Sequence, residues 1–161
     1  MNITGMMHVN VNCSDYERSR EFYEFLGFKV LWEVPTRNTP EVAAAVGMPP
    51  YKVRGALLHL AGSPTTPLID LLEWKEPRDS ETPYPHLYHL GIARIALLTS
   101  NMEADVQALK ARGVELLSEP VVLSPPDAPP ARFVCFKDPD GTILELVETN
   151  PLPRQRDEKV R

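Results

Sequence analysis

A single acidic residue, Glu145, lies in the middle of an apolar run near the end of the chain. Aliphatic and β-branched residues dominate this run, residues 142–147, which is typical of a β-strand. A carboxylate inside such a strand is unfavourable unless it is paired, hydrogen-bonded or bound to a cation. Two interpretations stay open: a structural ion pair, or a metal or substrate ligand that lines a cavity.

A second group of polar side chains lies near the N-terminus. Residues 6–12 alternate in polarity, so that His8, Asn10 and Asn12 share one face of a predicted strand. His8 can bind a metal ion through a ring nitrogen. Asn10 would form part of the same wall, and the sequence assigns it no more specific task.

Other histidines and acids have simpler interpretations. His59 alternates with Leu57 on another predicted strand. It either faces a cavity and contacts substrate, or is a hydrogen-bonded structural histidine. His86 and His89 lie in a proline-rich segment and are expected on the surface. Glu73, at the end of a strand, is also expected on the surface.

Composition limits the class of protein. The chain has 161 residues, 43% of them hydrophobic and 24% charged, which fits one globular domain or two small half-domains. A net charge of −5 gives no reason to expect nucleic acid or an anionic membrane as a partner. No apolar run reaches the roughly 18 residues of a spanning helix, and Cys13 and Cys135 are expected to be reduced core residues. We therefore expect a soluble, cytoplasmic protein.

The elements that must position these residues follow from periodicity and capping signals. Ser14 is predicted to be the N-cap of a helix that Gly27 ends, and Thr39 the N-cap of a short helix over 40–46. In the first half, strands are predicted at 6–12, 28–34, 53–61 and 68–74. In the second half we predict strands at 91–99, 114–117, 133–136 and 142–147, a helix at 101–112, a loop at 120–130 and a turn at 138–141.

These elements repeat along the chain. Three pairs of residues are each 86 positions apart: Gly5 and Gly91, Ser14 and Ser100, and Gly27 and Gly113. The segment Ile69–Glu73 also matches Leu144–Glu148. The sequence thus predicts an α+β fold of two tandem βαβββ modules that form a half-open mixed β-barrel, with helices outside and a cavity inside. The expected boundaries are 3–76 and 91–149 for the modules, 77–90 for a linker and 150–161 for a polar tail.

The chain resembles the vicinal oxygen chelate superfamily, which includes glyoxalase I, bleomycin-resistance proteins, extradiol dioxygenases and methylmalonyl-CoA epimerase. The resemblance rests on Ser19–Phe28, Val106–Val114 and Asp138–Leu146, which occur in the family's order, and it covers roughly residues 3–149. It implies the glyoxalase-like fold. It does not imply one chemistry, because members of this superfamily catalyse different reactions on one scaffold.

The resemblance also implies four ligand positions, one on the first and one on the last strand of each module. They fall on His8, Asp70, Arg94 and Glu145. The first two and Glu145 can bind a divalent cation, whereas an arginine is always protonated and has no lone pair to donate. Either a metal ion keeps three protein ligands, or Arg94 replaces the metal and pairs with Glu145, with Asp70 or with a substrate carboxylate.

Two functions follow from the resemblance. The first is a lyase, isomerase or epimerase that acts next to a carbonyl, with Glu145 and Arg94 as catalytic residues and Arg94, Asn10 and His59 as substrate-binding residues. The second is a protein that sequesters a small molecule, as the drug-resistance members do. The implied cofactor is one divalent ion (Zn, Ni, Mn, Co or Fe) or none. The implied partners are a small, anionic ligand and a second copy of the chain in a homodimer. An extradiol dioxygenase is disfavoured, because its iron needs two histidines and one carboxylate.

Overall fold

The computed structural model describes residues 2–63, 67–124 and 129–149. The chain divides into two compact units, Met1–Thr82 and Pro83–Arg161. The predicted polar tail, 150–161, lies outside the described residues. Each unit is described by itself below.

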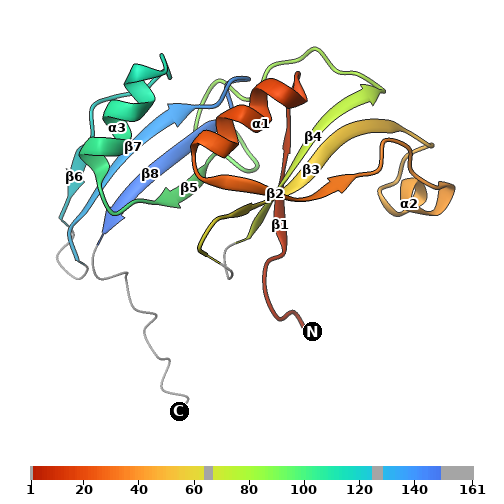
Figure 1. Cartoon of the computed structure of the whole chain (residues 1–161), viewed down its shortest axis with the longest axis horizontal. Helices are drawn as coiled ribbons and strands as arrows, with labels where there is room; N and C mark the ends of the chain where they lie inside the picture. Colours follow the sequence, from red (N-terminus) through yellow and green to blue (C-terminus); the bar gives the residue numbers. More distant parts are fainter. Residues whose placement is uncertain (1, 64–66, 125–128, 150–161) are drawn as a thin grey trace. The chain divides into compact units, whose positions relative to one another are not determined.

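The first unit is a four-stranded mixed sheet with one long and one short helix (Figure 1). The sheet order is β1-β4-β3-β2, with β1 parallel to β4 and the other pairs antiparallel. The elements are β1 (His8–Asn12), α1 (Tyr16–Phe25), β2 (Phe28–Val34), α2 (Pro40–Ala45), β3 (Lys52–Leu60) and β4 (Leu68–Glu76).

The second unit repeats this topology. Its sheet order is β5-β8-β7-β6, again with the first and last strands parallel and the other pairs antiparallel. The elements are β5 (Ile95–Leu98), α3 (Met102–Ala111), β6 (Val121–Leu123), β7 (Ala131–Lys137) and β8 (Ile143–Thr149). The predicted α+β class and the two βαβββ modules are confirmed.

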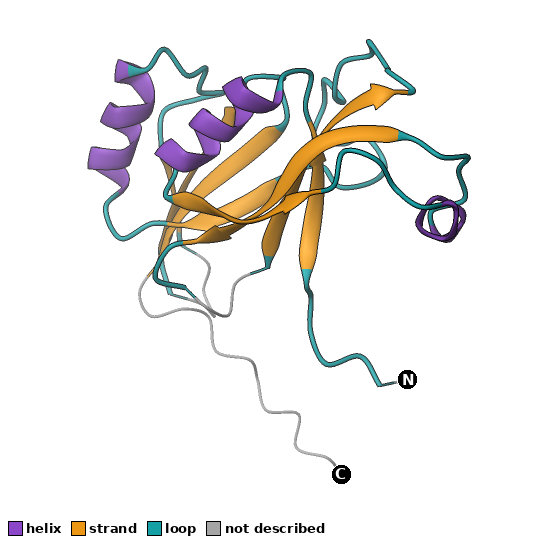
Figure 2. Ribbon diagram, turned by 45° about the vertical axis from the view of Figure 1, so that its right-hand side comes forward, coloured by secondary structure: helices purple, strands orange, loops and turns teal. Residues whose placement is uncertain are grey.

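In each unit the long helix covers one face of the sheet (Figure 2). Aliphatic side chains on that face are fully buried, among them Leu58 and Leu71 in the first unit and Val134 and Leu144 in the second. Each such side chain contributes about 2 kcal/mol through burial. The opposite face of each sheet carries the residues that alternate with these.

The repeat is confirmed, but the helix N-caps lie one residue later than Ser14 and Ser100. The N-caps are Asp15, which accepts a hydrogen bond from the backbone N–H of Arg18, and Asn101, which accepts one from Ala104. They are again 86 residues apart, as the predicted caps Ser14 and Ser100 are. An Asp or Asn cap is as favourable as Ser, so local preference could not decide between adjacent candidates.

Strand prediction was less accurate in the second unit. The strand predicted at 91–99 is confined to β5, and 114–117 contains only one bridge, between Leu116 and Phe136. The second strand of the module is β6, inside the predicted loop at 120–130. All three β6 residues are exposed, so its strand conformation depends on pairing with β7 and not on a buried side chain.

The predicted surface position of Glu73 is wrong, because this residue is only 5% exposed. Its carboxylate accepts a hydrogen bond from the first N–H of α1, at Tyr16, with a nitrogen-to-oxygen distance of 3.3 Å. The second unit has the same contact, from the N–H of Met102 to Glu148 at 3.0 Å. A negative charge at a helix N-terminus is favourable because the first N–H groups have no partner within the helix.

An arginine on the third strand of each module completes this arrangement. Arg132 donates to Glu148 at 3.2 Å and to Glu103 of α3 at 2.5 Å. In the first unit Arg54 donates to Glu17 of α1. The two helix glutamates are 86 residues apart. Each helix is therefore joined to its sheet by a strand glutamate at its first N–H and by an arginine that pairs with a helix glutamate.

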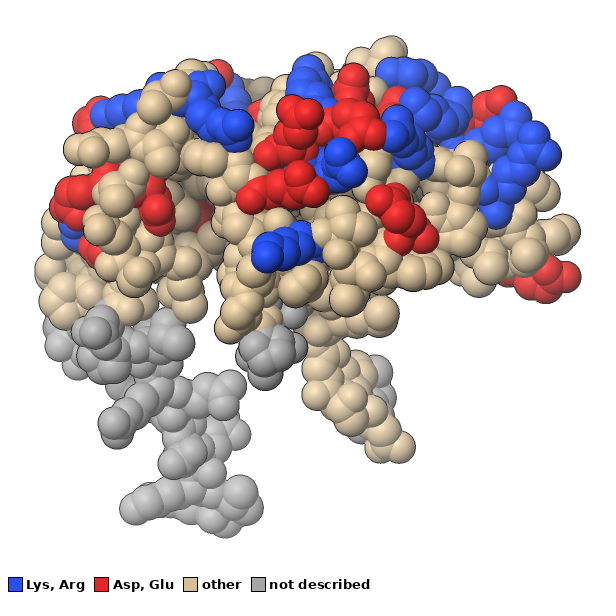
Figure 3. Space-filling model, viewed as in Figure 1, with Lys and Arg blue, Asp and Glu red and all other residues tan. Residues whose placement is uncertain are grey.

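Around α1 the surface charges are mixed in sign (Figure 3). Arg20 lies between Glu17 and Glu24, at 2.8 and 3.9 Å, and each pair joins adjacent helical turns. Such exposed pairs contribute little to stability, but they leave no strongly basic patch over this helix. Among the described residues, no helix is both long enough and apolar enough to cross a membrane.

Replacing Glu148 tests the contact between strand and helix. We expect Glu148→Ala to lower the free energy of unfolding by about 1–3 kcal/mol, because Met102 and Arg132 each lose an acceptor. Urea denaturation followed by circular dichroism measures this change. Glu119→Ala is the control: Glu119 is an exposed partner of Lys110, so its loss should change stability by less than about 0.5 kcal/mol. Equal effects of the two substitutions would contradict the proposed role of Glu148.

Candidate functional site

The closing hairpin that carries Glu145 is fixed by its turn. The carboxylate of Asp138 accepts hydrogen bonds from the N–H groups of Asp140 and Thr142 at 3.0 and 2.8 Å. Gly141 has a positive φ of 97°, which few other residues adopt easily. This turn sets the register of β7 and β8, in which Cys135 is directly opposite Glu145.

Glu145 forms an ion pair with Arg94. The Nε of Arg94 donates to Oε2 of Glu145 at 2.8 Å. Arg94 immediately precedes β5, in which Ala96 is the register partner of Glu145, so alternation puts Arg94 on the Glu145 face. The Glu145 side chain is 9% exposed and that of Arg94 is 45% exposed. Of the two interpretations of the acidic residue, the structure shows the ion pair.

The rest of the Arg94 guanidinium remains available for a ligand. A guanidinium has five N–H groups, and the bond to Glu145 uses one. Within the described part of the second unit, 83–124 and 129–149, no group accepts a hydrogen bond from Nη1 or Nη2 of Arg94. These two nitrogens are arranged to bind a carboxylate or phosphate in bidentate fashion.

The other side chains on this face are mostly apolar. We call this surface, opposite to α3, the open face of the second sheet. Strand register and alternation assign its residues. They are Arg94, Ala96, Leu98, Val121, Leu123, Ala131, Phe133, Cys135, Lys137, Ile143, Glu145, Val147 and Thr149.

Cys135 lies beside the ion pair and is 8% exposed. Burial raises the pKa of its thiol, and the Glu145 carboxylate raises this pKa further, while Arg94 lowers it. The thiol is therefore protonated at neutral pH and is a weak nucleophile. It contributes a neutral surface next to the ion pair.

The corresponding pair in the first unit is His8 and Asp70. Their Nε2 and Oδ2 atoms are 3.9 Å apart, and their side chains are 41% and 17% exposed. Burial raises the pKa of the Asp70 carboxyl above its usual value, and the nearby His8 lowers it. The Nδ2 of Asn10 donates to the backbone oxygen of Asp70 at 2.9 Å, so the Asn10 amide helps to join β1 to β4.

His59 lies on β3, on the same face as Asp70. Leu57 is the register partner of Asp70, and His59 follows two residues later, opposite Lys29 of β2. It is partly exposed. Its predicted contact with substrate stays a prediction.

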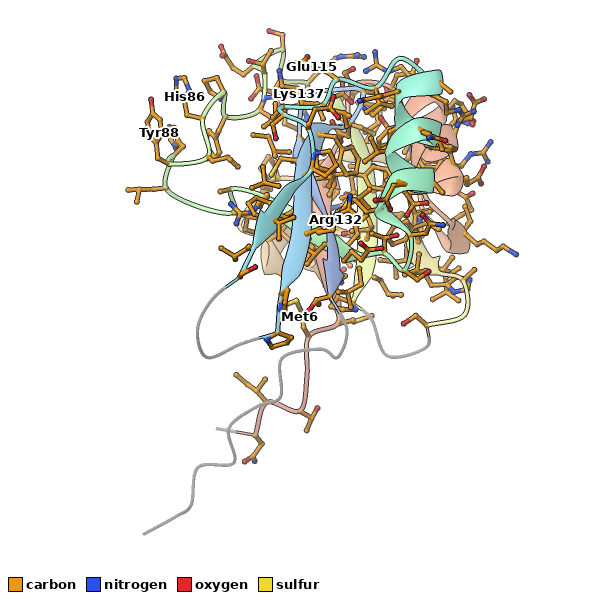
Figure 4. All side chains as sticks on the ribbon, turned by 90° about the vertical axis from the view of Figure 1, so that its left-hand side faces the viewer. Met6, His86, Tyr88, Glu115, Arg132 and Lys137 are labelled. Carbon is orange, nitrogen blue, oxygen red and sulfur yellow. The ribbon has the colours of Figure 1, made fainter. Side chains whose placement is uncertain are left out.

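The two remaining histidines lie outside both faces, in the segment that precedes β5. His86 stacks on Tyr88 with ring centroids 4.8 Å apart, and His89 stacks on Tyr84 at 4.0 Å. Figure 4 shows His86 and Tyr88 together on a loop that extends away from the strands. Their predicted surface position is confirmed.

Neither pair of side chains at the positions that correspond to metal ligands is by itself a complete ligand set for a divalent cation. His8 and Asp70 offer one nitrogen and one oxygen donor. In the second unit the only carboxylate of the pair is bonded to a permanent cation, Arg94. Across the described residues, no group of three or more His, Cys, Asp or Glu side chains is arranged to hold a metal ion.

The apolar part of this site and the glutamates that anchor the helices were not predicted from the sequence. The match between Ile69–Glu73 and Leu144–Glu148 shows that Glu73 and Glu148 correspond, and this could have indicated a shared structural task. No comparable signal pointed to Leu123, because β6 is short and was expected to be a loop.

Comparisons with known proteins agree with this architecture. The family model of the glyoxalase/bleomycin resistance protein/dioxygenase superfamily matches residues 5–146. The protein YwkD of Bacillus subtilis (strain 168) is 31% identical over 149 residues, which are 92% of this chain and 99% of YwkD.

Solved structures show the same fold. A glyoxalase family protein from Bacillus cereus superposes with a TM-score of 0.77 at 16% identity, covering 92% of this chain and 96% of that one. A glyoxalase family protein from Enterococcus faecalis gives a TM-score of 0.63 at 26% identity, with 92% and 100% covered. The family predicted by the resemblance is confirmed: the chain belongs to the glyoxalase/bleomycin resistance protein/dioxygenase superfamily.

Proposed function

We propose that this protein binds a small organic anion on the open face of the second sheet, with Arg94 as the anion-binding group in place of a metal ion. The ion pair between Arg94 and Glu145 supports this most directly. Because Glu145 is almost buried, it holds Nε of Arg94 in place, while the Arg94 side chain as a whole stays 45% exposed. Such pre-positioning reduces the entropy lost on binding.

A negative ligand also suits the charge balance of the site. The ion pair is neutral overall, but its positive end is exposed and its negative end is covered. The nearby Lys137, at the end of β7, is paired with Glu115 at 2.7 Å. Figure 4 labels these two side chains. Arg94 is thus the cation on this face that can bind an anion without breaking another ion pair.

Replacing Arg94 tests the proposal. We expect Arg94→Gln to weaken the binding of small carboxylates or phosphates by about 10–100-fold, because a charge-assisted bidentate contact is lost. A thermal-shift screen identifies the anions, and isothermal titration calorimetry measures the dissociation constants. Lys110→Gln removes the same charge from a surface pair on α3 and should change them less than about twofold. Equal binding by the wild type and Arg94→Gln would refute the anion site.

The metal content of the purified protein tests the other half of the proposal. We expect no stoichiometric Zn, Ni, Mn, Co or Fe in protein prepared without chelators, because the donor set around Glu145 includes a permanent cation. Inductively coupled plasma mass spectrometry measures this for the wild type and for His8→Ala. A stoichiometric metal in the wild type that is lost in His8→Ala would instead support the metal-dependent enzyme.

A second candidate function is catalysis next to a carbonyl, by a lyase, isomerase or epimerase. The observation in its favour is that a carboxylate and a cation lie 2.8 Å apart on one face. Glu145 would accept a proton from the carbon beside the carbonyl. The electron pair of the broken C–H bond would then move toward the carbonyl oxygen, whose negative charge Arg94 would stabilise.

Hydrogen exchange separates this enzyme from a protein that only binds its ligand. For an enzyme, we expect a bound 2-oxo acid in D₂O to exchange the hydrogen next to its carbonyl, with a rate at least about 100-fold lower for Glu145→Gln. Proton NMR follows the signal. Binding without any enhanced exchange would leave sequestration as the function.

The homodimer implied by family resemblance stays a prediction, as does the cytoplasmic location. Sedimentation velocity on the full chain measures the first of these. Cell fractionation measures the second.

A further inference from the structure

The open face of the second sheet is mostly apolar around the ion pair of Arg94 and Glu145. Lys137 and Glu115 are paired with each other at one end of β7, and the other register positions across the strands carry neutral side chains. Three of the aliphatic ones are strongly exposed: Leu98 at 59%, Val121 at 48% and Leu123 at 53%. This exposed apolar surface is continuous with a guanidinium that has free N–H groups.

We infer that the ligand of this face is an amphipathic monocarboxylate, that is, one carboxylate joined to an apolar chain or ring. The inference rests on the proposed anion site and specifies its substrate class. Arg94 provides one bidentate position for one carboxylate. A second charge on the ligand would lie against Leu98, Phe133 or Val147 with no partner, which is unfavourable.

The dimensions of the sheet set the size of the apolar part. Neighbouring strands are about 4.8 Å apart and residues along a strand about 3.3 Å apart. Leu98, the last residue of β5, follows Arg94 by four residues, which corresponds to roughly 13 Å of extended chain. An apolar body of about 10 Å, such as the chain of octanoate, would therefore extend from Arg94 to Leu98, whereas acetate and butanoate would not.

The alternative occupant of an exposed apolar face is another protein surface. Two observations favour the small carboxylate. The face carries a cation with unused hydrogen-bond donors, which a flat apolar partner would bury without compensation. The buried carboxylate of Glu145 already has Arg94 as its partner. One negative charge on the ligand would therefore satisfy the remaining N–H groups of Arg94.

Calorimetric titration of the full chain with butanoate, octanoate and octanamide tests the inference. We expect octanoate to bind at least about tenfold more tightly than butanoate, because four added methylenes each gain up to roughly fourfold when buried. Octanamide should bind at least about tenfold more weakly than octanoate. Leu98→Asn should reduce the ratio of the butanoate to the octanoate dissociation constant by at least about threefold. The dissociation constant of butanoate itself should not change.

Val122→Asn is the matched control, because Val122 is 63% exposed and alternation along β6 puts it on the opposite face of the sheet. It should change neither dissociation constant. Equal affinity for butanoate and octanoate, both dependent on Arg94, would overturn the amphipathic class and leave the anion site intact. No binding of either carboxylate, or equal binding of octanamide, would overturn the anion site itself. If Leu98→Asn changes only the sedimentation coefficient, the face is an interface between copies of the chain and the inference is wrong.

Discussion

The contact between a strand glutamate and the first N–H of a helix determines how each unit of this protein is built. In both units the second half of the last strand carries this glutamate, Glu73 or Glu148, and its carboxylate is bonded to the helix that follows the first strand. The helix must therefore lie on that face. Because side chains alternate along a strand, the acid three residues earlier, Asp70 or Glu145, must lie on the opposite face. One interaction thus covers one face and leaves the other for a ligand.

The two units use the same position for different chemistry. On the first strand, His8 lies near Asp70 without a direct hydrogen bond, at 3.9 Å, while Arg94 is bonded to Glu145 at 2.8 Å. A neutral imidazole can bind a metal ion or transfer a proton, whereas a guanidinium does neither at ordinary pH. The second unit thus has an arginine where the first unit has a histidine. This one difference replaces two side chains that could bind a metal ion with a salt bridge, and the remaining N–H groups of its guanidinium can bind an anion.

Much of this could be predicted from the sequence, since repeated glycines and a repeated strand pattern specify the modules and the family. Arg94 could be placed opposite Glu145 because the repeat aligns it with His8. What could not be predicted depends on long-range pairing. The strand β6 has no buried side chain and exists through its hydrogen bonds to β7, and the buried carboxylate of Glu73 accepts a hydrogen bond from a helix residue 57 positions earlier in the chain.

The burial of Glu145 explains why Arg94 cannot be treated as an incidental surface residue. A carboxylate that is 9% exposed requires a charged or multiply hydrogen-bonded partner, and the register offers Ala96 and Cys135 as its nearest cross-strand neighbours. Neither can neutralise it, since the Cys135 thiol is protonated and Ala96 is apolar. Arg94 thus stabilises the buried charge of Glu145 and is held for the ligand by the same bond. Stability and ligand binding are coupled through this ion pair, because the exposed guanidinium of Arg94 is the group that can bind the ligand.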